Sequence, residues 1–481
     1  MGNPKAFLSI NRKEAGYRPV HERVADFGEV EQTLNSEDRK LQASRCMDCG
    51  VPFCHWACPL GNRIPEWQDH LHKGEWIKAM QILTSTNDFP EFTGRICPAL
   101  CEKSCVLSLQ QSPITCRENE VAIIEKAFLE GYIKPTPPAT RTGKRVAVVG
   151  SGPAGLTVAN RLNKLGHEVT VYEKNAKSGG LLRYGIPDFK LNKSVIDRRI
   201  RLMEAEGVQF CNNQAVGHNL AVDRLRKEYD AVCLAIGSEH PRDLQVAGRE
   251  LTGIYPAMTY LAEQNRLCSG ELVAGEQSIS AKGKHVLVIG GGDTGSDCVG
   301  TAIRQGAASV TQIEIMPKPP VGVNDATPWP QYPNVLKTSS SHAEGCERMW
   351  SKNTVKFEGD ANGYVTSATL QTVSWSKAED GRMQMVAVAD SEEVVKADLV
   401  LLALGFVHPI KEGVIESLSL ITDGRGNIAT DDSLMTSTEG VFAAGDAATG
   451  QSLVVKAIER GRTVAQAIDA YLKSKNNEST K

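Results

Sequence analysis

The sequence predicts an α/β protein: an N-terminal helical iron–sulfur domain, then two Rossmann-like nucleotide-binding domains, one inserted in the other. Three observations support this prediction. Seven of the thirteen cysteines lie between Cys46 and Cys105, two strand–glycine-loop–helix patterns follow, and a Gly-Asp pair ends a short apolar segment near the C-terminus. The predicted boundaries are 1–140 for the cluster domain, 141–275 and 396–481 for an FAD-binding domain, and 276–395 for an inserted NAD(P)H-binding domain.

The first domain has helical periodicity, with apolar residues on one face of a helix predicted over residues 66–83. Its cysteines read Cys46-x2-Cys49-x4-Cys54-x3-Cys58-Pro59 and Cys97-Pro98-x2-Cys101-x3-Cys105. An iron–sulfur cube takes about four thiolates from a tight loop and a distant return segment. Structural zinc also uses Cys-x2-Cys pairs, so a non-enzymatic zinc-stabilised scaffold is the competing interpretation. The x4 gap, the x3 return spacing and the Cys-Pro pairs favour clusters.

A stiff proline-rich linker, residues 134–138, separates this domain from the first nucleotide-binding pattern. A strand over 145–149 enters a loop, and a second strand over 167–172 ends at an acid. The glycines allow a tight turn and let backbone N–H groups approach a pyrophosphate, while the acid can accept hydrogen bonds from ribose hydroxyls. The predicted site residues are Gly150, Gly152, Pro153, Ala154, Gly155 and Glu173.

The pattern restarts with a strand over 284–289, followed by Gly290, Gly291, Gly292, Asp293, Thr294 and Gly295. Two such folds are expected where a flavin and a nicotinamide nucleotide are both bound. The matching acid is Glu314, which favours a free ribose 2′-OH and therefore NADH. Lys318 or Arg304 could instead reach the 2′-phosphate of NADPH.

The C-terminal part contains a predicted strand over 397–404 and the segment Gly440 to Asp446. An aspartate after such a strand typically bonds the flavin's ribityl chain in two-domain flavoproteins, so Gly445 and Asp446 are candidates. A helix over about 452–472 would point its N-terminus at the flavin ring and stabilise its reduced, anionic form.

Composition excludes other classes of function. The net charge of -3 does not favour a nucleic-acid partner, and no apolar run approaches the ~18 residues that span a bilayer. The polar N-terminus lacks the apolar stretch of a signal peptide, so we expect a cytoplasmic protein. Clustered cysteines in that reducing compartment favour metal or cluster ligation over disulfides.

Together these stretches, with Gly94 to Pro98 and Gly179 to Pro187, resemble the small (β) subunit of NAD(P)H-dependent glutamate synthase over nearly the whole chain. The N-terminal module of dihydropyrimidine dehydrogenase is similar. The resemblance adds Gly180 and Leu181 to the FAD site and implies two [4Fe-4S] clusters with interleaved ligands. One would take Cys46, Cys49, Cys54 and Cys105; the other would take Cys58, Cys97, Cys101 and Glu120. Cys116 is nearby and remains an alternative to Glu120.

The resemblance implies that NADPH or NADH delivers hydride to FAD. Electrons would then pass through the clusters to FMN in a large (α) subunit that carries the glutaminase site. That subunit would make two L-glutamate from L-glutamine and 2-oxoglutarate, and no general acid or base is expected here. NADPH-using relatives often have an arginine pair just after the acid, where Ile315 and Met316 stand. The alternative is an electron-input subunit of another complex, of the sulfide dehydrogenase, bifurcating transhydrogenase or dihydropyrimidine dehydrogenase type.

Overall fold

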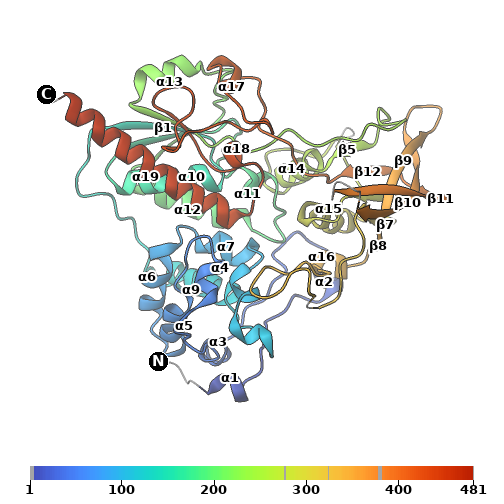
Figure 1. The fold of residues 1–481 in the computed structure, drawn as a ribbon, viewed down its shortest axis with the longest axis horizontal. Coiled ribbons are helices and arrows are strands. Elements are labelled where there is room, and N and C mark those ends of the chain that lie inside the picture. Colours follow the sequence, from blue (N-terminus) through green and yellow to red (C-terminus); the bar gives the residue numbers. More distant parts are fainter. Residues whose placement is uncertain (1–4, 276–277, 323, 378–381, 480–481) are drawn as a thin grey trace.

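The computed structural model describes residues 5–275, 278–322, 324–377 and 382–479. The blue helical part in Figure 1 lies against two α/β units, one green and red, the other mainly gold. This is the predicted fold class. No helix in the described residues is long and apolar enough to cross a membrane.

The N-terminal part is built from short helices around the fully buried Trp67. The helix predicted over 66–83 is two helices, because Gly74 has a φ of 76° and turns the chain between them. The elements are α1 Ala6–Ser9, α2 Val20–Arg23, α3 Ser36–Ser44, α4 Phe53–Ala57, α5 Ile64–His72, α6 Trp76–Thr86, α7 Pro90–Ile96, α8 Leu100–Lys103, the 3₁₀ helix η1 Val106–Leu109 and α9 Arg117–Leu129.

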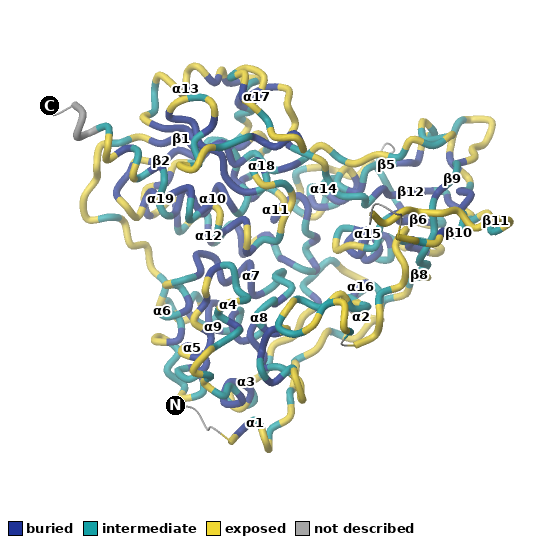
Figure 2. Tube along the Cα trace, in the orientation of Figure 1, coloured by how far each residue is buried: buried dark blue, intermediate teal, exposed yellow. Residues whose placement is uncertain are grey.

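The first α/β unit is a parallel sheet in the order β13-β4-β1-β2-β3. Its strands are β1 Arg145–Val149, β2 Glu168–Tyr172, β3 Gln209–Cys211, β4 Ala231–Leu234 and β13 Val441–Ala443. The helices of this unit are α10 Pro153–Lys164, α11 Leu181–Tyr184, α12 Lys193–Ala205, α13 Val222–Glu228, α17 Val414–Ser417, α18 Asp446–Thr449 and α19 Val454–Ser479. Helices α10 and α19 share one apolar core with the sheet, and Figure 2 colours many residues of these elements as buried.

The second unit is a parallel sheet in the order β5-β12-β6-β7-β8. Its strands are β5 Ile254–Pro256, β6 His285–Ile289, β7 Ser309–Glu314, β8 Glu347–Trp350 and β12 Leu399–Leu402, and its helices are α14 Ala257–Cys268, α15 Asp293–Arg304 and α16 Ser340–Ala343. A three-stranded antiparallel sheet, β9 Lys352–Gly359, β10 Val365–Lys377 and β11 Met383–Lys396, projects from its edge in Figure 1.

The inserted unit is longer than predicted at both ends. Strand β12 was expected to open the second part of the FAD domain, but it pairs with β6 and β5. The four residues of β12 are all buried, and hydrogen bonding in the second sheet decides where they belong. The chain crosses between the units where Pro241 and Phe406 form an antiparallel bridge. The boundaries at 275/276 and 395/396 are therefore corrected to positions near 240 and 407.

A buried ion-pair triad joins the helical part to the second unit. Glu344, just after α16, accepts hydrogen bonds from Arg23 of α2 (2.7 Å) and from Arg304 of α15 (2.6 and 3.0 Å). The side chains of Arg304 and Glu344 have no exposed surface. The Arg304 guanidinium also lies 3.9 Å from the ring centre of Phe189, in the segment before α12. The triad thus fixes the relative positions of all three parts.

Candidate cofactor sites

A cavity of about 970 Å³ lies where the three parts meet. Its wall contains most residues predicted for the FAD site: Gly150, Gly152, Pro153, Ala154, Glu173, Gly180, Leu181 and Asp446. The apolar share of the wall includes Leu453, just before α19, and Val454 and Ala457 at the start of that helix. The cavity therefore has the size and lining that a bound dinucleotide requires.

The glycines of the first loop have different tasks. Gly150 has a φ of 101°, and a Cβ there would overlap the carbonyl oxygen of Ala235, the residue that follows β4. A Cβ on Gly155 would overlap the carbonyl oxygen of Gly150, so Gly155 sits behind the wall and allows α10 to pack closely on the loop. Gly152 faces open space at the N-terminus of α10, where a pyrophosphate can approach the backbone.

Two acids orient this site. Glu173 follows β2, is buried, and accepts hydrogen bonds from the N–H groups of Ser151 (3.3 Å) and Asn175 (2.9 Å), as well as from the Ser151 hydroxyl. Asp446 begins α18 and accepts a hydrogen bond from the Ser452 hydroxyl (2.8 Å). Burial raises the pKa of Asp446. Gly445 has a φ of 65° and a hypothetical Cβ there would meet Ala154, which places the Gly-Asp turn against the glycine loop.

The second glycine loop repeats the first. Gly290 has a φ of 124°, and a Cβ there would overlap the carbonyl oxygen of Ala403, while a Cβ on Gly295 would overlap that of Gly290. Gly292 faces open space before α15, and Asp293 lines the large cavity. Gly290, Gly292, Thr294 and Glu314 are not in that cavity wall. They surround the N-terminus of α15 at the carboxyl edge of the second sheet.

Replacing Gly292 with alanine should therefore block the approach of a nicotinamide nucleotide without unfolding the unit. We expect normal flavin content and a KM for the nucleotide raised by about tenfold or more, because the methyl group displaces the pyrophosphate from the backbone. The matched variant Gly290→Ala should instead lower thermal stability, since its φ and its contact with Ala403 are both unfavourable. Equal thermal stability of the two variants would contradict this division of tasks.

The acid of the second unit is held by the backbone. The Glu314 carboxylate accepts the N–H groups of Gly291 (2.7 Å) and Met316 (3.1 Å). Arg304, considered from the sequence as a phosphate contact, is buried against Glu344 and does not reach this edge. Lys318 is exposed beside it. The preference for NADH that Glu314 indicates remains a prediction.

The first predicted set of cluster ligands meets around a small cavity. Cys46 and Cys49 precede α4, Cys54 lies within it, and Cys105 immediately precedes η1. All four line the same cavity. The pKa of Cys46 is raised to about 12, chiefly by burial and to a lesser extent by the neighbouring thiols Cys105 and Cys49.

The second set lies between α4, α7, α8 and α9. Cys58 and Cys97 immediately follow α4 and α7, Cys101 is in α8, and Glu120 is in α9. Helix α7 can approach α9 closely because Gly94 has no Cβ; a Cβ at this position would overlap Val121. Glu120 lies near enough to Cys58 and Cys97 to raise the pKa of both thiols, although burial is the larger cause.

Glu120 is a buried carboxylate surrounded by donors. It accepts hydrogen bonds from Asn62 (3.3 Å), Asn87 (3.1 Å) and the Thr93 hydroxyl. Burial raises its pKa to about 7. A ligand position fits these contacts, because the three donors orient the carboxylate and a cation would offset the cost of burying its charge.

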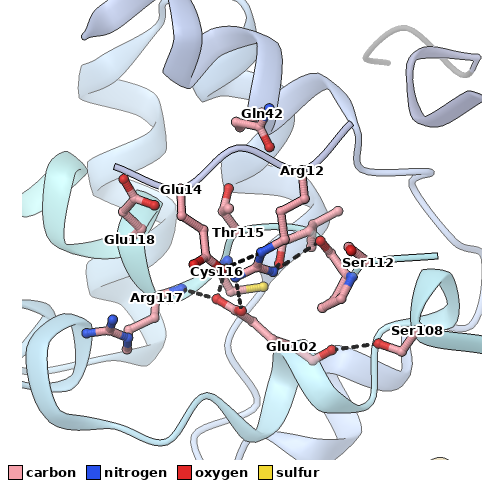
Figure 3. A network of polar contacts seen from close by, with 12 residues as sticks. Arg12, Glu14, Gln42, Glu102, Ser108, Ser112, Thr115, Cys116, Arg117 and Glu118 are labelled. Carbon is pink, nitrogen blue, oxygen red and sulfur yellow. Dashed lines mark hydrogen bonds and ion pairs between the residues drawn. The ribbon is translucent and has the colours of Figure 1, made fainter. Parts of the chain in front are cut away.

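Cys116 is one helical turn before Glu120 but is held differently. Its thiol is buried and hydrogen-bonded to Cys101, and burial raises its pKa. Figure 3 shows it beside Glu102, whose carboxylate accepts the N–H groups of Cys116 (2.8 Å) and Arg117 (3.0 Å) and pairs with Arg12. Cys116 thus lies near Cys54 and Cys101, whereas Glu120 lies near Cys58 and Cys97. Within the described residues, no three His, Cys, Asp or Glu side chains are grouped as for one metal ion.

Sequence reasoning missed an ion pair in the cavity wall. Lys190 precedes α12 and pairs with Asp297 of α15, and both residues line the cavity. The pair joins the first and second units across the wall of the large cavity. Neither residue belongs to a glycine loop or follows a strand, so the sequence carried no local signal for it.

Comparisons with known proteins match the same parts of the chain. A family model described as "Pyridine nucleotide-disulphide oxidoreductase" matches residues 144–461. A second, described as dihydropyrimidine dehydrogenase domain II, 4Fe-4S cluster, matches residues 23–131. The two matches cover the two nucleotide-binding units and the cysteine-rich part respectively.

Curated relatives match almost the whole chain. "Glutamate synthase [NADPH] small chain" of Mycobacterium tuberculosis is 48% identical over 98% of this chain and 96% of its own length. The protein of the same name from Bacillus subtilis is 41% identical, over 98% and 99%. "Glutamate synthase [NADH]" of Schizosaccharomyces pombe is 46% identical over 98% of this chain but only 23% of its own length. Among solved structures, M. tuberculosis FprA has a TM-score of 0.56 at 18% identity over 70% of this chain and 86% of its own, which indicates a shared fold.

Proposed function

Because the chain belongs to the glutamate synthase small-chain family, we propose that it oxidises NAD(P)H and supplies the electrons for glutamate formation on a large partner chain. It is an oxidoreductase with a pyridine-nucleotide domain and a 4Fe-4S domain. The name "small chain" implies a large-subunit partner. That partner would carry FMN and the glutaminase site, and would convert L-glutamine and 2-oxoglutarate into two L-glutamate.

The position of Cys97 carries the proposal. Of the seven clustered cysteines, Cys97 lies in the wall of the large cavity, beside Ile96 and Pro98. The set of Cys58, Cys97, Cys101 and Glu120 would therefore hold the [4Fe-4S] cluster nearer the flavin. The set of Cys46, Cys49, Cys54 and Cys105 would hold the second cluster, farther along the route to the partner.

The residues present fit these groups. Burial raises the pKa of Cys58 to about 12, so a free thiol there stays protonated, whereas bound iron stabilises the thiolate. FAD, when bound, accepts two electrons as hydride and releases them one at a time. Gly152 would face its pyrophosphate, Glu173 its ribose, and Asp446 its ribityl chain.

We assign no general acid or base to this chain. Its contribution to the reaction is to position the nicotinamide against the flavin. The Lys190–Asp297 pair holds the nicotinamide-binding unit against the flavin-binding unit, and the Arg23–Glu344–Arg304 triad holds it against the helical part. Leu453, Val454 and Ala457 give the cavity an apolar wall, which would limit access of water to a flavin bound there.

The function is tested by reconstitution with the large chain. Anaerobically purified protein should reduce dyes with NAD(P)H alone, and should form glutamate from glutamine and 2-oxoglutarate only when the large chain is added. Dye reduction without glutamate formation in the assembled complex would contradict the proposed partner and favour another electron acceptor.

The eighth ligand is tested by two variants of α9. Glu120→Ala should lower the iron content from about eight to about four atoms per chain, since each [4Fe-4S] cluster holds four and needs its full set of ligands. Cys116→Ser should leave the iron content unchanged, because it keeps a small hydrogen-bonding side chain beside Cys101. The reverse pattern in an iron and acid-labile sulfide assay would assign the position to Cys116.

A further inference from the structure

The segment between α6 and α7, residues 86–88, supports the buried carboxylate of Glu120. The Thr86 hydroxyl donates to the side-chain oxygen of Asn62 (3.0 Å), and the Asn62 amide donates to one Glu120 oxygen (3.3 Å). The Asn87 amide donates to the other Glu120 oxygen (3.1 Å). The direction in which Glu120 points therefore depends on where this segment is held.

The same segment is bonded on its other side to α10 and α19. Arg462 of α19 donates a hydrogen bond to the carbonyl oxygen of Thr86. Asp88, whose side chain is 2% exposed, accepts hydrogen bonds from Asn160 (2.9 Å) and Arg161 (3.0 Å) of α10. The Nε atom of Arg462 lies 3.8 Å from the same carboxylate. The segment thus connects Glu120 with two helices of the flavin-binding unit.

These two helices also form part of the wall of the large cavity. Ala154 of α10 and Ala457 of α19 both line it. The helices touch at Gly461, where a Cβ would overlap the carbonyl oxygen of Ala154. An α-helix rises about 1.5 Å per residue, so Arg462 lies only about 8 Å farther along α19 than Ala457. Arg462 is therefore placed between the cavity and the ligand set that contains Glu120.

The charge at this junction is positive. Two guanidinium groups, those of Arg161 and Arg462, face the single carboxylate of Asp88. Burial lowers the pKa of Arg462 and Arg161 lowers it further, while Asp88 and Cys58 are among the groups that raise it. Cys58 thus lies within electrostatic reach of the Arg462 guanidinium, and it belongs to the same ligand set as Glu120.

We propose that Arg462 is a positioning residue for electron transfer, which holds the 86–88 segment against the flavin-binding unit and raises the reduction potential of the cluster nearer the flavin. The inference rests on the proposed function, which supplies the flavin and this cluster. One electron leaves the reduced flavin and enters the cluster, and no proton moves at Arg462. A cation beside the cluster favours its reduced form, because reduction adds one negative charge there.

A redox titration followed by electron paramagnetic resonance tests this role on the holoenzyme, with a chemical reductant and mediators in place of NAD(P)H. The signal of the nearer cluster is the one that Cys97→Ser removes. Arg462→Ala should lower the equilibrium constant for its reduction by about tenfold, which is about 59 mV for one electron. Arg462→Lys keeps the charge and should retain most of the wild-type potential. Asp88→Asn removes the opposing charge and should shift the potential upwards.

Arg460→Ala is the matched control, because Arg460 is an exposed arginine of the same helix that lies 3.6 Å from Glu459. It should leave the potential unchanged, and the signal of the farther cluster should not move in any of these variants. Unchanged potentials in Arg462→Ala and Asp88→Asn, or shifts of the same sign in both, overturn the proposal. If Arg462→Ala loses iron, an upward shift in Asp88→Asn supports the proposal and an unchanged potential overturns it.

The titration is independent of the partner chain and of the nicotinamide nucleotide. The expected shifts in a protein that forms no glutamate with the large chain would therefore overturn the proposed function and leave the role of Arg462 standing. Glutamate formation with unshifted potentials would do the reverse.

Discussion

Cys105→Ser should abolish glutamate formation by the assembled enzyme while leaving NAD(P)H-driven dye reduction largely intact. Cys105 belongs to the ligand set that lies away from the flavin cavity, and it shares its cavity with Cys46, Cys49 and Cys54. Loss of a ligand should lower glutamate formation by about 100-fold or more, because weaker perturbations around metal sites already cost 10–100-fold. A small dye can take electrons directly at the flavin, so dye reduction should fall by about threefold or less.

Cys268→Ser provides the control, because Cys268 is an exposed cysteine at the end of α14, in the second unit. It should leave dye reduction and glutamate formation unchanged. Both activities are followed on the same preparation, with iron content measured beside them. An equal loss of the two activities in Cys105→Ser would mean that this cluster is not simply downstream of the flavin.

Glu344→Ala should lower the free energy of unfolding by about 3–5 kcal/mol, the usual cost of removing one partner from a buried ion pair. Glu344 is the acid of a triad in which Arg23 and Arg304 are also buried. Its loss leaves the two buried guanidinium groups at this junction without the carboxylate that balances their charge. Urea titration followed by tryptophan fluorescence measures the change.

The control is Glu228→Ala, which breaks an exposed pair with Arg224 within α13. It should cost about 0.5 kcal/mol or less. Glu344→Gln keeps a hydrogen-bond acceptor but not the charge. Its loss in free energy of unfolding should therefore lie between those of Glu344→Ala and Glu228→Ala. If Glu344→Ala and Glu228→Ala unfold at the same urea concentration, the triad does not fix the domain arrangement.

Local sequence patterns were sufficient to predict the elements whose structure depends on neighbouring residues in the chain. A β-branched strand that runs into glycines was enough to place β1 and β6. The repeat holds at Gly150 and Gly290, each of which lies against the carbonyl of the residue that follows a neighbouring strand. The cysteine spacing favoured iron–sulfur ligation, while the division into two interleaved ligand sets came from the family resemblance. The glycine loops and their strand-end acids were recognisable from local spacing, whereas Gly180 and Leu181 also came from the resemblance.

Long-range pairing was not predictable. The strand over 397–404 reads as an apolar run in either sheet, and only its hydrogen bonds to β6 and β5 assign it to the inserted unit. The Lys190–Asp297 pair and the hydrogen bond from Arg462 to Thr86 also depend on segments that meet only after folding. Arg304 looked available for a phosphate because the sequence does not show its partner Glu344.

Electron paramagnetic resonance of the anaerobically purified chain, frozen after addition of excess NADPH, tests the central claim most directly. We expect signals from reduced iron–sulfur centres that appear together with bleaching of the flavin, and that diminish in Cys97→Ser, whose position adjoins the cavity. A bleached flavin without any paramagnetic iron signal, in protein shown to contain iron and sulfide, would contradict electron transfer from the cavity to the cysteine-bound centres.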